Sequence, residues 1–333
     1  MARRHEEMDA SRFPLGAVAP LASGSADIAK PRRLSKPKSE RRSGRVLSRL
    51  MGCSVGLILW TVVTMVSPAP GPSLQLRRES PLVLGILEDT SRIRIPRLIH
   101  QSWKSTDKIP SRFAPWMRSW VQMHPGWQYV YWGDDDNLAL FEKLYPKYLD
   151  VARQVGKIGL ADMARYALLH RLGGLYVDAD FECKQPFDKL HREYDVFLSS
   201  EPRAHAILLE GSPTPALCNA LMASVPGHPF WIKVLDSIKE AYESGVAPGD
   251  TVTLTGPRIV KKAYETSTNT DVVVLDPEYF YPEVAYWNMG NLKKKCDPNN
   301  AVGLVKEACD WLDRFPNGEF TNNTYATHHW QCT

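Results

Sequence analysis

The sequence predicts an α/β fold, and the prediction rests on three consecutive features of residues 160–180. Apolar side chains recur there at three- and four-residue spacings, which is typical of a packed helix: Ala161, Ala164, Leu168 and Leu172. Gly173 and Gly174 then end the helix, because glycine adopts the left-handed cap conformation without steric cost. Residues 175–177 form a short apolar run rich in strand formers, so we expect a buried strand directly after the helix.

Two carboxylates follow this predicted strand. Asp178 and Asp180 are two residues apart, so an extended chain points both side chains to one side of the strand's carboxyl end, where α/β sheets place ligand sites. Neighbouring carboxylates repel each other unless a cation lies between them. Carboxylate oxygens favour Mg²⁺ or Mn²⁺, and these ions leave coordination positions open for phosphate oxygens. The residues alone leave two interpretations open: a metal site for a diphosphate substrate, or an ordinary turn or helix cap.

This segment resembles the Asp-x-Asp sugar-binding region of glycosyltransferase family 32. That family includes fungal Golgi mannosyltransferases, inositol-phosphorylceramide mannosyltransferases, and animal α-1,4-galactosyl- and N-acetylglucosaminyltransferases. The matching positions are Asp162, Arg165, Tyr166, Gly173, Gly174, Tyr176, Asp178 and Asp180. Residues 95–103 resemble the family's opening strand, and the resemblance continues to the C-terminus. It implies a Rossmann-like GT-A glycosyltransferase domain that uses a nucleotide-sugar donor with Mn²⁺ or Mg²⁺.

The resemblance also implies roles for single residues. Asp178 and Asp180 are the catalytic pair: Asp180 binds the metal directly, and Asp178 contacts the metal or the donor ribose. Asp162 and Arg165 are expected to bind the donor sugar; the alternative is a helix-surface ion pair, since residues three apart share a helix face. Trp103 is expected to stack on the nucleotide base, with a core aromatic as the equal alternative.

The C-terminus supplies further candidate ligands. By resemblance to a His-x-Trp pattern, His328 completes the metal shell and Trp330 binds the donor diphosphate through its indole N–H. His329 stands beside them as an additional metal candidate. A neutral imidazole suits Mn²⁺ better than Mg²⁺. The alternative is a structural histidine.

The N-terminal part has a different composition. Residues 1–50 carry 12 Lys and Arg against 5 Asp and Glu, and the remaining residues carry 29 against 32. The positive net charge of +4 therefore comes from the N-terminal tail, and no nucleic-acid surface is predicted on the folded part. We expect a disordered cytosolic tail at 1–49, a single-pass signal-anchor at 50–66, a stem at 67–91 and a luminal catalytic domain at 92–333. The basic excess before residue 50 favours a type II orientation in the Golgi membrane.

The other elements follow from local patterns. Strands are predicted at 97–103, 127–132 and 196–200, helices at 111–124, 229–242 and 258–264, and a loop at 210–219. Residues 134–137 contain a second Asp-x-Asp, but they precede an amphipathic run and are better interpreted as a helix cap than as a metal site.

The cysteines and one sequon agree with a luminal domain. Five cysteines follow the predicted anchor, so at least one remains unpaired within the chain. Cys296 and Cys309 are a plausible local bridge, although the spacing does not fix the connectivity. Asn322 begins the only glycosylation sequon, Asn-Asn-Thr.

The expected function is a metal-dependent, retaining glycosyltransferase. The Asp-x-x-Arg-Tyr form and the His-His-Trp ending resemble the mannosyltransferase branch most, which implies GDP-mannose as donor and a glycolipid or glycan acceptor such as inositol phosphorylceramide. A UDP-sugar-dependent α-1,4-galactosyl- or N-acetylglucosaminyltransferase is the alternative within the class. Outside it stand a non-catalytic glycan-binding relative and an aspartyl-phosphate hydrolase, which usually has Thr or Val where this chain has Glu182.

Overall fold

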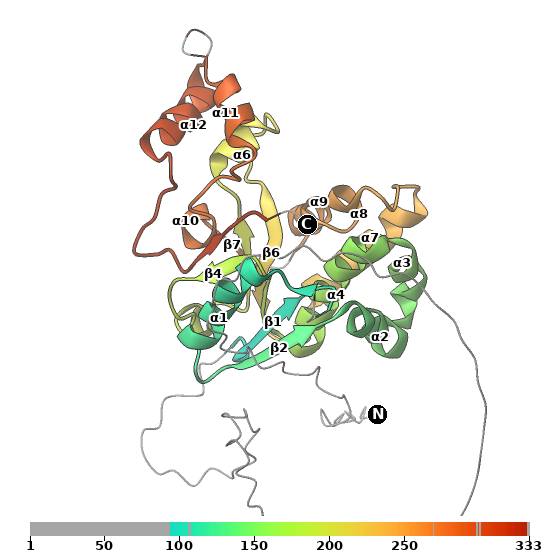
Figure 1. The fold of residues 1–333 in the computed structure, drawn as a ribbon. Helices are drawn as coiled ribbons and strands as arrows, with labels where there is room; N and C mark the ends of the chain where they lie inside the picture. The colour runs from blue at the N-terminus through green and yellow to red at the C-terminus, as the bar shows by residue number, and fades with distance from the viewer. Residues whose placement is uncertain (1–93, 106–107, 269, 298, 300, 332–333) are drawn as a thin grey trace, which may run out of the picture. The chain divides into compact units, whose positions relative to one another are not determined.

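The computed structural model describes residues 94–331 except 106–107, 269, 298 and 300 (Figure 1), and all of these belong to one compact unit. The predicted tail, anchor and stem lie outside the described residues. Within the described part, no helix is both long enough and apolar enough to cross a bilayer.

The core of the unit is a mixed six-stranded sheet in the order β2-β1-β3-β6-β5-β7. The strands are β1 (Leu98–Ser102), β2 (Gln128–Trp132), β3 (Gly174–Val177), β5 (Val196–Ser200), β6 (Leu217–Ser224) and β7 (Val272–Leu275). β6 runs antiparallel to both of its neighbours, and the other pairs are parallel. β4 (Phe181–Cys183) and β8 (Ala326–His328) form a second, two-stranded sheet. The predicted α/β fold is confirmed.

Helices surround the sheet. The α-helices are α1 (Ala114–Met123), α2 (Asp134–Leu144), α3 (Leu149–Gln154), α4 (Gly156–Leu172), α5 (Leu190–Glu193), α6 (Arg203–Leu208), α7 (Pro229–Glu243), α8 (Thr251–Leu254), α9 (Pro257–Glu265), α10 (Pro277–Phe280), α11 (Met289–Lys295) and α12 (Gly303–Arg314). Single 3₁₀ turns at Ser111–Phe113 and Pro146–Tyr148 precede α1 and α3.

Alternating strand residues divide the core into two clusters. Tyr176 of β3 packs with apolar residues of α4, α7 and α9, whereas its neighbours Leu175 and Val177 pack with residues of α1, β4, α10 and β8. Successive side chains of a strand point to opposite faces of the sheet. The helix α4 therefore lies against one face of the sheet, and the C-terminal strand β8 belongs to the cluster on the other.

The central helix–strand unit forms as predicted. α4 ends at Leu172, and Gly173 caps it with φ +65°, a left-handed value that glycine tolerates best. β3 begins at the next residue, and all four of its residues are buried. Gly174 also has a positive φ of +94°, and a Cβ there would lie 2.5 Å from the carbonyl oxygen of Leu98 in β1. Both glycines are thus required by the backbone.

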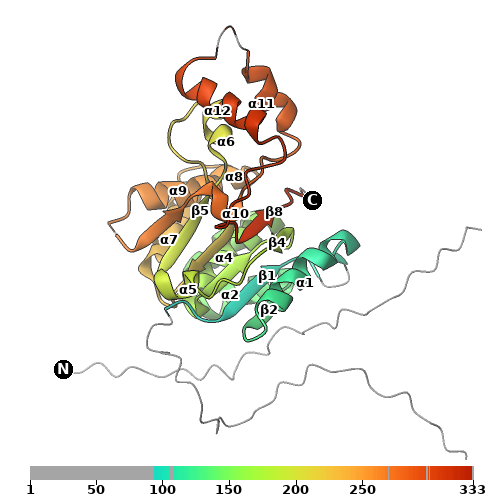
Figure 2. The same cartoon turned by 90° about the vertical axis from the view of Figure 1, so that its left-hand side faces the viewer.

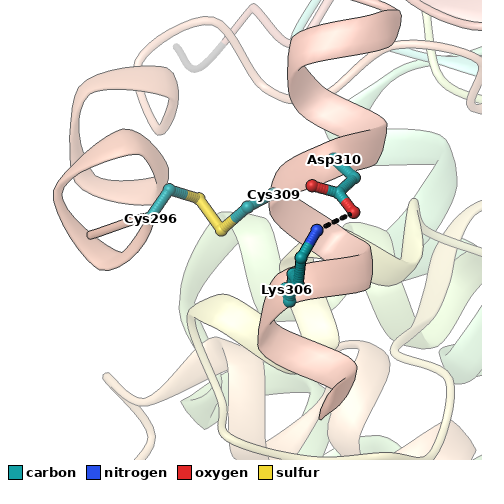
Figure 3. Close-up of a disulfide and its surroundings, with 4 residues drawn as sticks. All are labelled: Cys296, Lys306, Cys309 and Asp310. Atoms are coloured by element: carbon teal, nitrogen blue, oxygen red, sulfur yellow. Dashed lines mark hydrogen bonds and ion pairs between the residues drawn. A yellow bond between two sulfur atoms is a disulfide. The ribbon is translucent and has the colours of Figure 1, made fainter. Parts of the chain in front are cut away.

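Two local predictions are confirmed. A carboxylate oxygen of Asp136 accepts a hydrogen bond of 2.9 Å from the backbone N–H of Gly133, so the second Asp-x-Asp caps the start of α2. Cys296 and Cys309 form a disulfide that joins the end of α11 to α12 (Figure 3). α6, α11 and α12 share a separate small core, which Figures 1 and 2 both show as one group of helices.

Candidate active site

Asp178 and Asp180 lie between β3 and β4, but not in the extended backbone that the sequence suggested. Residues 179–180 form a turn, in which the N–H of Phe181 donates to the carbonyl oxygen of Asp178 at 3.2 Å. Ala179, between the two carboxylates, is buried. The two carboxylates have different hydrogen-bond and ion-pair partners, although the charge of Asp180 still raises the pKa of Asp178.

The carboxylate of Asp180 faces the C-terminal segment. Its Oδ2 lies 3.1 Å from Nε2 of His328 and accepts a 2.8 Å hydrogen bond from the backbone N–H of Gln331. Burial raises the pKa of Asp180, but its contacts with His328 and with the backbone N–H of Gln331 outweigh burial and bring the pKa below its usual value. Asp180 is therefore held ionised although its side chain is only 10% exposed.

The strands β4 and β8 lie side by side (Figure 2), and their pairing brings His328 to this position. Phe181 pairs with His328 in the antiparallel register, and the two rings stack with centroids 4.4 Å apart. Nδ1 of His328 is buried and has no hydrogen-bond partner among the described residues. Trp330 packs against His328 at 4.3 Å between centroids, and its indole N–H donates to the carbonyl oxygen of Glu283 at 3.2 Å.

His329 has a different environment from His328. Its Nε2 lies 3.1 Å from a carboxylate oxygen of Glu182, and its ring stacks on Trp116 of α1 at 3.9 Å between centroids. Lys184 also contacts Glu182, at 2.8 Å. Burial lowers the pKa of His329, and the carboxylate of Glu182 opposes that effect. We call residues 178–180 the acidic turn. The Glu182–His329 pair thus lies next to the acidic turn and does not contact the carboxylate of Asp180.

Asp178 faces α4. Its Oδ1 accepts a hydrogen bond of 2.9 Å from the Tyr176 hydroxyl and lies 3.4 Å from Nη1 of Arg165. The guanidinium of Arg165 also covers the Tyr176 ring, 4.6 Å from its centroid. Burial raises the pKa of Asp178, and Arg165 offsets part of that effect. The side chain remains 30% exposed, so one part of the carboxylate is held and another part is accessible.

Asp162 and Arg165 form a buried pair rather than a surface pair. Nη2 of Arg165 lies 3.0 Å from Oδ1 of Asp162. Asp162 also accepts hydrogen bonds from the Asn219 amide and the Thr255 hydroxyl, both at 2.9 Å. Burial raises the pKa of Asp162, although the charge of Arg165 opposes the rise. The network fixes Arg165, which in turn contacts Asp178; donor binding by Asp162 and Arg165 stays a prediction.

Trp103 follows β1 and lies near the acidic turn. Its ring packs edge-on against Phe113 at 5.1 Å between centroids, and both belong to a small apolar cluster with Ala179. The indole N–H donates to the carbonyl oxygen of Lys108 at 2.8 Å. Trp103 is partly exposed and packs at the edge of the core. Base stacking on its ring stays a prediction.

Asp180 and His328 fit a divalent metal ion that the substrate helps to coordinate. Two neighbouring ligand atoms that each lie about 2.1 Å from an octahedral ion are about 3 Å apart. Oδ2 of Asp180 and Nε2 of His328 are 3.1 Å apart. No group of three or more His, Cys, Asp or Glu side chains in the described part of the chain is arranged to hold a metal. Phosphate oxygens would therefore supply other ligands, as Mg²⁺ and Mn²⁺ sites in transferases permit.

Several contacts of the site were not predicted from the sequence. Asn219 was placed in a loop but lies in β6, where its amide contacts Asp162. The backbone N–H of Gln331 donates to the carboxylate of Asp180, and Trp116, within the helix predicted at 111–124, stacks on His329. Only Thr255 had a signal, because the Thr-Gly-Pro at 255–257 resembles the family pattern.

Comparison with known proteins gives one family and several relatives. Residues 110–197 match the family described as "glycosyltransferase sugar-binding region containing DXD motif". The chain is 33% identical over 181 residues to mannosyl phosphorylinositol ceramide synthase CSH1 of Saccharomyces cerevisiae, covering 53% of this chain and 45% of that protein. It is 31% identical over 152 residues to inositol phosphoceramide mannosyltransferase 1 of Schizosaccharomyces pombe, covering 44% of each. The chain thus spans less than half the length of these relatives.

Solved structures are similar only at a low level. The PaToxG glycosyltransferase is 16% identical with a TM-score of 0.39, over 68% of this chain and 82% of that one. The galactosyltransferase LgtC is 10% identical with a TM-score of 0.38, over 70% of this chain and 87% of that one. The match of residues 110–197 to the sugar-binding region and the similarity to the two mannosyltransferase relatives confirm the family resemblance seen in the sequence.

Proposed function

We propose that the chain is a metal-dependent, retaining mannosyltransferase of the GT-A type. The proposed donor is GDP-mannose, and the proposed acceptor is a hydroxyl of a glycolipid, with inositol phosphorylceramide as the first candidate. One observation carries the proposal: β8 places His328 against Asp180 at the end of the sugar-binding region. The relatives named above, mannosyl phosphorylinositol ceramide synthase and inositol phosphoceramide mannosyltransferase, support the choice of sugar and acceptor.

The chain's own side chains divide the work. A bound Mn²⁺ or Mg²⁺ would offset the negative charge of the departing diphosphate. Asp180 and His328 would hold it, since Oδ2 of Asp180 and Nε2 of His328 are 3.1 Å apart and each side chain is only 10% exposed. Arg165, fixed by Asp162, orients Asp178 toward the donor. Trp103 is the proposed platform for the nucleotide base, and its partly exposed ring near Ala179 supports that role.

Retention is proposed on the family resemblance, and we assign no carboxylate nucleophile. Each of the three carboxylates around the acidic turn has a cationic or imidazole partner: Asp178 with Arg165, Asp180 with His328, and Glu182 with Lys184 and His329. Carboxylates held in this way are suited to positioning and charge balance.

The location in the cell is proposed from residues outside the described part. The apolar run at 50–66 and the basic tail before it support a single-pass, type II anchor with the catalytic domain in the Golgi lumen. Protease protection of microsomes distinguishes the orientations. A luminal domain stays intact until detergent is added, whereas a cytosolic domain is digested at once.

A transfer assay tests the enzymatic proposal. The full chain in detergent is incubated with Mn²⁺, inositol phosphorylceramide and one of three donors: GDP-mannose, UDP-galactose or UDP-N-acetylglucosamine. Mass spectrometry should show a product heavier by one hexose with GDP-mannose alone, and no product with Asp180→Asn. Product from a UDP-sugar instead would overturn the mannosyl assignment. Absence of transfer and of donor hydrolysis with every donor would favour a non-catalytic glycan-binding protein.

A further inference from the structure

Exposed apolar and basic side chains are concentrated in residues 286–302, which contain α11, and we call this set of side chains the α11 surface. Its members are Tyr286, Trp287, Lys293, Lys294, Lys295 and Val302. The apolar members are strongly exposed: Val302 to 74%, Tyr286 to 64% and Trp287 to 40%. Exposure of several large apolar side chains on one short segment is energetically unfavourable, and such surfaces often bind a partner.

The charge of the α11 surface is mainly positive. Residues 286–302 contain three lysines and one acidic residue, Asp297. All three lysines are exposed in the last turn of α11, and none has an ion-pair partner in the part of the chain that the structure describes. By contrast, Lys306 on the neighbouring helix α12 pairs with Asp310 at 2.6 Å (Figure 3). The basic charge of α11 is therefore available to an outside anion.

The α11 surface adjoins the candidate active site. Trp287 contacts Trp330 edge-on, with ring centroids 6.1 Å apart, and Trp330 packs against His328 at 4.3 Å. One buried ring thus separates the exposed surface from the proposed metal ligand. The α11 surface therefore adjoins the candidate site at its Trp287 end.

We infer that the α11 surface docks the domain onto a bilayer made anionic by the acceptor lipid itself, whose phosphate head group carries the negative charge. Trp and Tyr prefer the membrane–water interface, and lysines next to it are attracted to anionic lipid head groups. The Cys296–Cys309 disulfide holds α11 against α12, so the surface is presented as a unit. The inference rests on the proposed function, because a lipid acceptor must present its head group beside His328 while its chains stay in the bilayer.

The inference is tested on the full chain in lipid nanodiscs by hydroxyl-radical footprinting. Oxidation of Tyr286 and Trp287 is compared between nanodiscs of phosphatidylcholine and nanodiscs that also contain phosphatidylinositol, with exposed Ile158 on α4 as internal reference. The aromatic residues should be oxidised several-fold more slowly in the anionic nanodiscs, and Ile158 equally in both. Equal oxidation of Tyr286 and Trp287 in both lipids would overturn the inference.

Charge-reversal variants make the test specific. Lys293→Glu, Lys294→Glu and Lys295→Glu together should abolish the protection, because each lysine changes the membrane-bound population on the order of fivefold. The matched control reverses three lysines elsewhere, Lys143, Lys261 and Lys262, and should keep the protection. Protection that survives in the α11 variant would contradict lipid docking through these lysines.

Transfer in detergent separates the two proposals. The α11 variant should transfer sugar to detergent-dissolved acceptor within about twofold of wild type, since no α11 residue touches the acidic turn. If wild type transfers no sugar in detergent, the proposed function fails, while the footprint still reports on docking.

Discussion

Nη2 of Arg165 lies 3.0 Å from Oδ1 of Asp162, and each of these side chains is only 8% exposed. Arg165 also donates to the carbonyl oxygen of Asn219 at 2.7 Å and contacts Asp178 at 3.4 Å. One guanidinium thus joins α4, β6 and the acidic turn, so the position of Asp178 depends on a buried cation.

Removal of this cation should destabilise the fold. Arg165→Ala leaves the buried carboxylate of Asp162 without its charge partner, and we expect the free energy of unfolding to fall by about 3–5 kcal/mol. Arg153→Ala, which breaks an exposed pair with Glu142, should cost less than about 1 kcal/mol. Denaturant titration of both variants measures the difference. Equal costs would show that the Arg165 network does not support the fold.

His100 should make stability depend on pH. Its Nδ1 accepts from the Trp132 indole at 3.1 Å, so Nε2 carries the proton and donates to the carbonyl oxygen of Gly173 at 2.9 Å. Burial lowers the pKa of His100 from 6.5 to about 4. Between those values only the unfolded chain binds the extra proton, so the free energy of unfolding decreases as the pH falls.

The size of this pH effect is testable with one variant. From pH 7.5 to pH 5.5 the contribution of His100 amounts to roughly 1 kcal/mol. His100→Asn should remove that part of the pH dependence, whatever it costs at neutral pH, because all other titrating groups are unchanged. Unfolding curves at the two pH values decide the matter. If His100→Asn leaves the difference in unfolding free energy between the two pH values unchanged, His100 takes up its proton in the folded protein as readily as in the unfolded chain.

Gly174 should not tolerate a side chain. Its φ is +94°, and a Cβ would lie 2.5 Å from the carbonyl oxygen of Leu98, so Gly174→Ala should cost about 2–4 kcal/mol of unfolding free energy. Gly126→Ala is the control, since a Cβ there meets nothing within 4 Å; its effect should stay within about 0.5 kcal/mol. Thermal unfolding compares the two. A stable Gly174→Ala variant would contradict the close β1–β3 approach.

Local signals in the sequence account for what could be predicted of the fold. The apolar spacing of α4, the glycine cap and the β-branched end of β3 all act within a few residues. β6 was missed because its sequence, LCNALMAS, contains no β-branched residue and was split by a predicted loop. Its strand conformation comes from pairing with β3 and β5 on both sides, which no local pattern reports.

The candidate site was predictable only in part for the same reason. The sequence identified Asp178, Asp180 and His328 as candidate site residues, but it did not identify the side chains that contact them. A local turn at 179–180 replaces the predicted extended backbone, and the β4–β8 pairing decides that the ring of His328 rather than that of His329 contacts the carboxylate of Asp180. The β4–β8 pairing brings together residues more than 140 positions apart in the chain.

Asp180 and His328 are the proposed centre of a metal-dependent donor site. The most direct measurement is isothermal titration calorimetry of GDP-mannose binding to the full chain, with Mn²⁺ and with a chelator. We expect Mn²⁺ to strengthen binding, and Asp180→Asn or His328→Ala to remove at least about tenfold of that gain. His329→Ala should keep most of it, because His329 contacts Glu182. Binding that is equal with Mn²⁺ and with chelator, or unchanged in Asp180→Asn, would contradict the claim.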